Sequence, residues 1–362
     1  MDFKNYNTYK EIIMQPESWE SALKDIVDNN LTVPGILKTA YDHVIFFGCG
    51  SSYNLGQSAS FFYRYLSGNT NSLALPSSEL LINPGLYISE NKKYLLVGFS
   101  RSGETTESLK VIEQMQVKKN ISILTFTCKD KSSFSKISIN NFLCRNAVEK
   151  SIVMTTSFSS MLLAFCSALA VAEGNKIIIN DFKKLIELTH LNQDTIVDFV
   201  DNFIQKVEFN SYFALGSGFN YGLAVEADLK MKEMSQVPSY SYHIHEFSHG
   251  PKSLLTDESL CIVLTPSKNM FKYEQSLKEF VQLGTNMLII GSQPVVDIEV
   301  SSLYHKIHIF FGEDSFQKYN LQNENIKSFI NIPVFQLMAF FNTLKNKLNP
   351  DIPNNLSYTV KI

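Results

Sequence analysis

The sequence has little tryptophan, few cysteines and no excess of positive charge. It contains one tryptophan and five cysteines among 362 residues, and its formal net charge at pH 7 is -3. Such a charge provides no basic field for nucleic acid or for an anionic membrane. We therefore expect neither of these as a partner, although a local site for a small anion is compatible with the overall charge.

The cysteines are odd in number and scattered, and no two form a Cys-x-x-Cys pair. This spacing indicates neither a zinc site nor a disulfide framework, and it fits a reducing compartment. The N-terminus lacks the basic-then-apolar order of a signal peptide. No run reaches the roughly 18 apolar residues that a membrane span needs. We expect a cytoplasmic protein.

Strands that alternate with helices predict an α/β fold. The short apolar runs 44–50 and 94–99 end in turns rich in glycine or serine and are followed by helical patterns, as buried parallel strands are. Repeated βαβ units build doubly wound parallel sheets with helices on both faces. A chain of 362 residues is long enough for two such domains.

The second half of the sequence repeats the first. The Gly-x-Gly-x-x-Tyr segment at 48–53 recurs at 216–221, and apolar runs follow both copies at similar offsets. We interpret this as an ancient duplication that produced two tandem doubly wound domains. The expected divisions are an N-terminal helical segment at 1–30, a first domain at 31–180, a second domain at 181–348 and a C-terminal tail at 349–362.

The loop Ser100-Arg101-Ser102-Gly103-Glu104-Thr105 lies between a predicted strand and a predicted helix. Ligands of open parallel sheets bind at the carboxyl ends of the strands, and helix N-termini favour anions. The hydroxyls of Ser100, Ser102 and Thr105 add donors that suit a phosphomonoester. The loop therefore predicts a phosphate site.

Serine and threonine before a helix are also common as caps, so the loop alone fits either role. Further hydroxyls at Ser51-Ser52 and at Thr155-Thr156-Ser157, each near a predicted strand-to-helix junction, favour phosphate. The loop is not a Walker loop, because no Gly-Lys-Ser/Thr follows it. The turn Gly48-Cys49-Gly50 lacks the third glycine of a dinucleotide fingerprint.

A helix expected at 221–234 carries charges inside its apolar face. At about 100° per residue, Glu226, Lys230 and Glu233 share a narrow arc, whereas Asp228 and Lys232 fall on the opposite, solvent-like face. Burying an unpaired charge costs several kcal/mol. The arc is either an internal Glu–Lys pair or a carboxylate and an ammonium directed into a cleft, and we favour the functional interpretation.

His249 precedes Gly250-Pro251, which places it on a loop. A loop histidine suits proton transfer near neutral pH. Zinc binding by His243, His245 and His249 is the alternative, but no carboxylate arrangement supports it. We expect acid–base chemistry and no bound metal.

In their order along the chain, these motifs resemble the tandem sugar isomerase (SIS) domains in the isomerase half of glucosamine-6-phosphate synthase. The resemblance runs from about residue 8 to the C-terminus. The phosphate or substrate contacts that it implies are Gly50, Ser51, Ser52, Ser100, Arg101 through its backbone, Ser102, Thr105, Thr155 and Tyr358.

The same resemblance implies roles for the charged residues. Glu233 would be the base that moves a proton between C1 and C2 of the sugar, with Glu226 and Lys230 positioning and polarising it. His249 matches a histidine that opens the sugar ring and comes from the neighbouring subunit, which implies a homodimer. No cofactor is implied, because a carbonyl beside a carbinol acidifies the C–H and one carboxylate can carry its proton.

Two departures from the synthase point towards breakdown. The chain begins Met1-Asp2 without the cysteine nucleophile of a glutaminase domain, so we expect no release of ammonia from glutamine. Tyr358 stands where the synthase has a Schiff-base lysine, and Thr156 also replaces a lysine. In these respects the chain looks like fructosamine-6-phosphate deglycases and amino-sugar-phosphate deaminases. The run Met154–Phe158 is also similar to tagatose-type ketose/aldose isomerase relatives.

The expected function is therefore deglycation or deamination of a 6-phosphorylated fructosamine or amino sugar by C1/C2 proton transfer. Simple ketose–aldose isomerisation of a phosphosugar is one alternative. A non-catalytic sugar-phosphate-binding regulator is the other, although Glu233 and His249 would be superfluous in a sensor.

Overall fold

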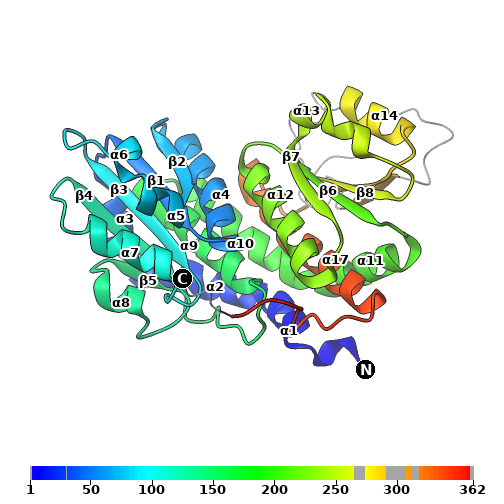
Figure 1. Ribbon diagram of the computed structural model, residues 1–362. Helices are drawn as coiled ribbons and strands as arrows, with labels where there is room; N and C mark the ends of the chain where they lie inside the picture. The colour runs from blue at the N-terminus through cyan, green and yellow to red at the C-terminus, as the bar shows by residue number, and fades with distance from the viewer. Residues whose placement is uncertain (1, 30, 265–273, 291–306, 311–317, 359–362) are drawn as a thin grey trace. The chain divides into compact units, whose positions relative to one another are not determined.

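The computed structural model describes residues 2–29, 31–264, 274–290, 307–310 and 318–358. The chain divides into two compact units (Figure 1). The first unit consists of Lys10–Ile186 with Asn355–Ile362, and the second consists of Met1–Tyr9 with Glu187–Asn354. Within the described residues, no helix has the length and apolar character that a membrane crossing requires.

The first unit contains a five-stranded parallel sheet with the strand order β2-β1-β3-β4-β5. Its strands are β1 (His43–Gly48), β2 (Ser72–Pro76), β3 (Tyr94–Ser100), β4 (Ile121–Thr127) and β5 (Asn141–Leu143). Its helices include α2 (Gln15–Lys24), α3 (Thr32–Lys38), α4 (Ser51–Ser67), α5 (Ser77–Ile82), α6 (Pro84–Tyr87), α7 (Thr106–Met115), α8 (Ser133–Ile137) and α9 (Thr156–Ala172).

Alternation along β1 shows why helices cover both faces of this sheet. Ile45 and Phe47 pack in a cluster with residues of α5, α7 and α8. Phe46 points to the other face, where its ring lies 5.1 Å from that of Phe165 in α9 and 6.2 Å from that of Tyr63 in α4. Successive side chains of a strand alternate between faces, so an apolar run with no polar alternation is buried on both sides.

The second unit has a parallel sheet of the same kind, with the order β10-β9-β8-β6-β7. The strands are β6 (Ser211–Gly216), β7 (Ser239–His243), β8 (Ser259–Leu264), β9 (Asn286–Ile290) and β10 (Ile307–Phe310). The helices include α11 (Gln193–Lys206), α12 (Phe219–Lys230), α13 (Ile244–Phe247), α14 (Glu274–Gln282), α16 (Glu324–Lys327) and α17 (Asn331–Lys345). Two further helices, α1 (Asn7–Ile13) and α10 (Lys176–Leu191), each contain a point where the chain passes from one unit to the other, and it passes once more after Asn354.

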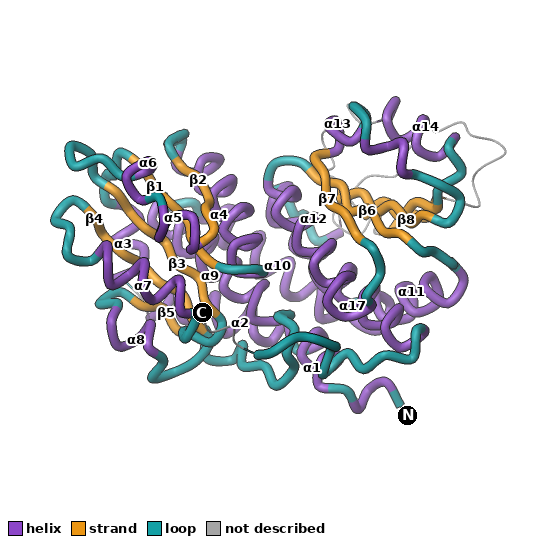
Figure 2. The backbone as a smooth tube through the Cα atoms, in the orientation of Figure 1, coloured by secondary structure: helices purple, strands orange, loops and turns teal. Residues whose placement is uncertain are grey.

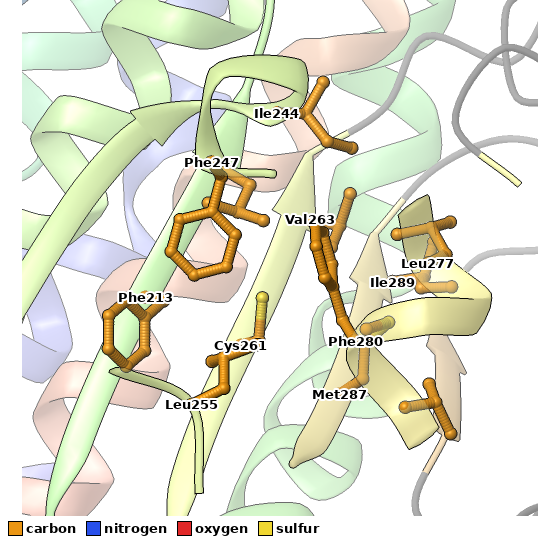
Figure 3. Packing of buried hydrophobic residues seen from close by; sticks show 12 residues of the cluster. Phe213, Ile244, Phe247, Leu255, Cys261, Val263, Leu277, Phe280, Met287 and Ile289 are labelled. Carbon is orange, nitrogen blue, oxygen red and sulfur yellow. The ribbon is translucent and has the colours of Figure 1, made fainter. Parts of the chain in front are cut away.

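One face of the second sheet forms an apolar core with α13 and α14 (Figure 3). Phe213 and Cys261 project from β6 and β8 towards Phe247 of α13 and Phe280 of α14, and the rings of Phe247 and Phe280 lie 5.2 Å apart, edge to face. Both sheets therefore follow the doubly wound plan, which confirms the predicted fold class. Figure 2 shows the alternation of strands and helices along each half of the chain.

The two halves match in detail as well as in plan. If β1 is paired with β6 and the later strands in turn, the two strand orders become identical. The turn after β1 has Gly50 at φ 54° and ψ -127°, and the turn after β6 has Gly218 at φ 58° and ψ -126°. These nearly equal backbone angles support the duplication that the repeated glycine segment predicts.

Candidate active site

The loop from Ser100 to Thr105 joins the end of β3 to the start of α7, as predicted. Ser100 Oγ accepts a hydrogen bond from the Gly103 N–H at 3.0 Å and lies 3.2 Å from Thr105 Oγ1. Ser102 Oγ accepts from the Glu104 N–H at 3.2 Å. Because Ser102 Oγ is the acceptor in this contact, its own hydrogen can be donated to an anion.

Hydrogen bonds to residues after β4 and at the start of α8 hold this loop in place. The Arg101 carbonyl accepts from the Cys128 N–H at 3.2 Å, just beyond β4. Glu104 accepts from the N–H and the hydroxyl of Ser133 at 3.0 and 2.7 Å. Partial burial opposes ionisation of Glu104, but these two hydrogen bonds lower its pKa. Gly103 has φ 63°, and a Cβ there would lie 2.4 Å from Ser132 Oγ, so this position requires glycine.

The Arg101 side chain is buried and faces protein groups. Its Nη1 pairs with Glu149 Oε2 at 3.1 Å, and its Nη2 donates to the Ile152 carbonyl at 2.8 Å. The centre of its guanidinium lies 4.1 Å from the centroid of the Tyr358 ring. The predicted contribution of Arg101 to phosphate binding would therefore come from its backbone.

Ser51 and Ser52 begin α4 at the carboxyl end of β1, next to the loop after β3. The register pairs Phe47 with Gly98, so both turns leave the same edge of the sheet from adjacent strands. Both serines are buried, and the Ser52 hydroxyl contacts Met154 Sδ at 4.0 Å. A Cβ on Gly48 would lie 2.6 Å from the Ser52 carbonyl carbon, so glycine allows the tight approach of strand and helix.

Two buried glutamates that the sequence analysis missed hold the segment before α9. Glu149 accepts hydrogen bonds from the N–H groups of Thr155 and Ser157 at 2.7 and 2.8 Å. Its oxygens also accept from both hydroxyls, so the hydroxyl hydrogen of Thr155, a predicted substrate contact, is used within the protein. The sequence shows Glu149 six residues before Thr155, but no local pattern distinguishes this buried glutamate from one on the surface.

Glu11 in α1 is the second of these carboxylates. It accepts from the N–H of Lys150 and from the N–H and hydroxyl of Ser151. Burial raises the pKa of Glu11 and the nearby charge of Glu149 raises it further, and these effects outweigh the opposing hydrogen bonds. Segments far apart in the sequence thus share one buried polar network in the first unit.

The charged arc of the second unit forms a buried triad. Lys230 Nζ lies 3.2 Å from Glu226 Oε1 and also pairs with Glu233 Oε2. The side chains of Glu226 and Lys230 are fully buried, whereas that of Glu233 is 21% exposed. Burial by itself lowers the pKa of Lys230, but the two carboxylates outweigh it and the net effect is a raised pKa. The two carboxylates therefore favour the protonated form of Lys230.

The helix that carries the triad is not a regular α-helix to its end. The α-helical part stops at Lys230, and Met231–Ser235 forms a π-helical turn that contains Glu233. Gln236 then ends the element with φ 56°. π-helical turns within α-helices occur frequently at functional sites.

The prediction that Asp228 faces solvent is wrong. Asp228 is only 6% exposed, and its carboxylate accepts from the Ser241 hydroxyl at 3.1 Å and from Lys232 Nζ at 2.9 Å. Ser241 lies on β7, which packs against α12. The helix is therefore covered on this side too, which its own periodicity does not reveal. Lys232 is 48% exposed, as the prediction requires.

His249 lies in the turn after α13, as predicted, and its side chain is exposed. The backbone N–H of His249 donates to the Glu246 carbonyl at 3.0 Å. His243 ends β7 and His245 lies in α13. Across the described ranges, no three or more His, Cys, Asp or Glu side chains are grouped so as to hold a metal ion.

The predicted residues thus divide between the two units. The hydroxyl-rich turns and Tyr358 belong to the first unit, and Glu226, Lys230, Glu233 and His249 belong to the second. The first set contains hydroxyl and N–H donors, and the second contains a carboxylate held beside an ammonium.

The sequence profile of the SIS domain matches residues 37–172 and 208–332, which contain the two sheets. The glutamine–fructose-6-phosphate aminotransferase (isomerizing) of Aquifex aeolicus is 23% identical over 368 residues, covering 99% of this chain and 58% of that protein. The chain therefore spans less than two thirds of the length of that relative.

Two solved structures are similar over nearly the whole chain. The glucosamine-6-phosphate deaminase of Thermotoga maritima is 25% identical with a TM-score of 0.78, covering 98% of this chain and 100% of that one. The tagatose-6-phosphate ketose/aldose isomerase of Escherichia coli is 22% identical with a TM-score of 0.83, covering 98% of this chain and 97% of that one.

Proposed function

This chain belongs to the SIS domain family, and on that premise we propose that it removes the amine from a 6-phosphorylated fructosamine or amino sugar. The observation that carries the proposal is the buried triad, in which Glu233 is the member with an exposed part. The similarity to a glucosamine-6-phosphate deaminase, over 98% of this chain and 100% of that one, supports the substrate class.

The hydroxyl-rich turns at the carboxyl edge of the first sheet would hold the phosphate. Ser51 and Ser52 begin α4, and the loop from Ser100 to Thr105 leads into α7. Helix-start N–H groups and serine hydroxyls donate to phosphate oxygens without requiring a counter-charge. This agrees with the Arg101 guanidinium being paired with Glu149.

Glu233 would carry the proton between C1 and C2. Lys230 is held between Glu226 and Glu233, so its ammonium fixes the position of the Glu233 carboxylate. A positioned carboxylate of this kind contributes about 10²–10⁴-fold to a proton transfer. With a fructosamine, the carboxylate removes a C1 proton and returns it to C2 through an enolamine. The imine that results reacts with one water to give an aldose phosphate and a free amine.

A 2-amino sugar would react in the same way, with the proton moving in the opposite direction between C1 and C2. Proton transfer from C2 to C1 leaves an imine at C2, and one water releases ammonia and a ketose phosphate. No enzyme lysine is needed to form the carbon–nitrogen bond, because the substrate already contains it. Tyr358 in place of a Schiff-base lysine is compatible with this direction.

We also propose that the enzyme is a cytoplasmic homodimer in which His249 of one subunit opens the sugar ring at the site of the other. The exposed position of His249 in a turn supports a role outside its own core. An exposed imidazole can exchange its proton with solvent between turnovers.

The test is incubation of the protein with fructosamine 6-phosphates, glucosamine 6-phosphate and galactosamine 6-phosphate, followed by measurement of the amine and hexose phosphate released. We expect release with at least one substrate and a loss of about 10²–10⁴-fold in kcat for Glu233→Gln. Glu208→Gln, at a carboxylate that is 84% exposed in the same unit, is the matched control.

Three outcomes would contradict the proposal. Equal turnover by the wild type and Glu233→Gln would exclude Glu233 as the base. Interconversion of ketose and aldose phosphates without amine release would establish the simple isomerase. Tight binding of the sugar phosphates with no turnover would establish a sensor.

A further inference from the structure

The Glu149 carboxylate is the most heavily bonded side chain near the predicted phosphate loop. Its side chain is fully buried, and it receives five donors. Oε1 accepts from the Thr155 N–H, the Thr155 hydroxyl and the Ser157 N–H at 2.7, 3.1 and 2.8 Å. Oε2 accepts from the Ser157 hydroxyl at 2.7 Å and from Arg101 Nη1 at 3.1 Å. A carboxylate offers about four lone-pair positions, so this one is saturated.

These donors come from separate parts of the first unit. Arg101 belongs to the loop after β3, whereas Thr155 and Ser157 begin α9. The tail joins the same network, because the Tyr358 hydroxyl donates to the Glu149 carbonyl at 3.4 Å and the Arg101 guanidinium lies on the Tyr358 ring. Glu149 therefore connects the loop, the start of a helix and the C-terminal tail.

We propose that Glu149 is a positioning residue that sets the affinity of the phosphate site through Arg101. Arg101 stands between Ser100 and Ser102, so fixing its side chain fixes the directions of the hydroxyl and N–H donors on either side. Donors that are held in place before the anion arrives lose less conformational entropy on binding. This inference rests on the proposed function, in which those donors contact the substrate phosphate.

The chemistry of the substitution explains why Glu149→Gln is informative. Glutamine has the same shape but places an NH₂ group where one carboxylate oxygen was. The Arg101 guanidinium and the N–H groups of Thr155 and Ser157 cannot accept from that group, whereas the two hydroxyls can. Arg101 would then lose its buried carboxylate partner and its fixed orientation. Arg101→Lys is the second variant, because lysine keeps the charge but cannot form the planar fork that reaches both Glu149 and the Ile152 carbonyl.

Glu11 provides a matched control in the same network. It is also a buried glutamate, 5% exposed, and it supports the same segment through Lys150 and Ser151. The hydrogen bonds that the described part of the chain gives it come from that segment and not from Arg101. Glu11→Gln therefore perturbs the packing of the segment, which Arg101 also contacts through the Ser151 carbonyl at 3.4 Å, without altering either member of the Glu149–Arg101 pair.

The experiment measures inorganic phosphate binding by calorimetry for the wild type, Glu149→Gln, Arg101→Lys and Glu11→Gln, with thermal melts to establish the folded fraction. We expect the phosphate Kd to rise about tenfold or more for Glu149→Gln and Arg101→Lys, on the scale of one charge-assisted hydrogen bond. For a turned-over sugar phosphate, KM rises more than kcat falls. Glu11→Gln lowers the melting temperature but keeps the wild-type Kd.

The possible failures are distinguishable. If the wild type binds no phosphate, the phosphate site of the proposed function is wrong. If the wild type binds phosphate and both Glu149→Gln and Arg101→Lys bind it equally well, the positioning role is wrong. A rise in Kd for Glu11→Gln as large as that for Glu149→Gln also overturns it, because general loosening of the segment would then explain both. If Glu149→Gln does not fold, Arg101→Lys decides.

Discussion

Three charged side chains lie within the apolar surroundings of α12 and its π-helical end. Lys230 is fully buried between Glu226 and Glu233, so each charge depends on the others. A buried ion pair adds little net stability over apolar residues of similar size, but removal of one partner leaves an uncompensated charge. The triad is therefore weak evidence for a purely stabilising role, which agrees with the proposed role of Glu233.

At this residue scale, we expect Lys230→Met to lower the free energy of unfolding by about 3–5 kcal/mol, because two carboxylates lose their shared ammonium. The double variant Glu226→Gln/Lys230→Met should recover a large part of that loss but remain inactive. Urea denaturation and amine-release assays check both expectations. Lys252→Met, at a half-exposed ion pair with Glu279, is the control and should change stability little. A double variant no more stable than Lys230→Met would contradict the explanation.

At the scale of elements, the same tight turn occurs in both units, where it joins β1 to α4 and β6 to α12. Gly50 and Gly218 adopt nearly the same left-handed backbone, and Gly48 and Gly216 allow the helix to approach its strand. A Cβ on Gly216 would lie 2.3 Å from the Asn220 carbonyl oxygen. Each turn thus determines where a helix begins relative to the edge of its sheet.

We expect Gly216→Ala and Gly48→Ala each to destabilise the protein by about 1–3 kcal/mol, since the added methyl forces the helix start to move. Gly48→Ala should also raise the phosphate Kd, because Ser51 and Ser52 move with α4. Gly35→Ala is the control: this glycine lies within α3 with open space around it, so alanine should stabilise by about 0.5–1 kcal/mol. If denaturant melts show that Gly35→Ala loses as much stability as Gly216→Ala and Gly48→Ala, the close approach of helix and strand does not explain the losses.

At the scale of the whole molecule, distant parts of the chain complete each unit. In the second unit, Asp351 accepts four hydrogen bonds from Asn7 and Thr8 at the start of α1. In the first unit, Tyr358 packs on Arg101, and Glu11 and Trp19 bond to residues near or in α9. The two ends of the sequence are therefore structural parts of both units.

We expect Asp351→Ala to lower the free energy of unfolding by about 1–2 kcal/mol, as the loss of a helix cap does, although this cap comes from the other end of the sequence. The N-terminal residues should also become more susceptible to limited proteolysis. Asp351→Asn keeps one acceptor oxygen and should fall between the wild type and Asp351→Ala. Proteolysis and stability unchanged from the wild type would show that these hydrogen bonds are not needed.

The sequence by itself determined the parallel sheets, their duplication and the places of the two predicted residue sets. These features depend on short-range patterns: apolar runs, glycine turns at strand ends and the spacing of Glu226, Lys230 and Glu233 on one helix. A pattern of a few residues reports local geometry directly, so the fold class and the position of the loop at Ser100–Thr105 between a strand and a helix followed from it.

Only the tertiary structure decided which buried groups face one another. Glu149 pairs with a residue 48 positions away, and Asp351 bonds to residues more than 340 positions away. No local spacing encodes such contacts. Asp228 was misplaced for the same reason, because β7 covers a helix face that periodicity alone assigns to solvent. A side chain's environment is set by whichever elements pack around it, and that packing is a property of the folded chain.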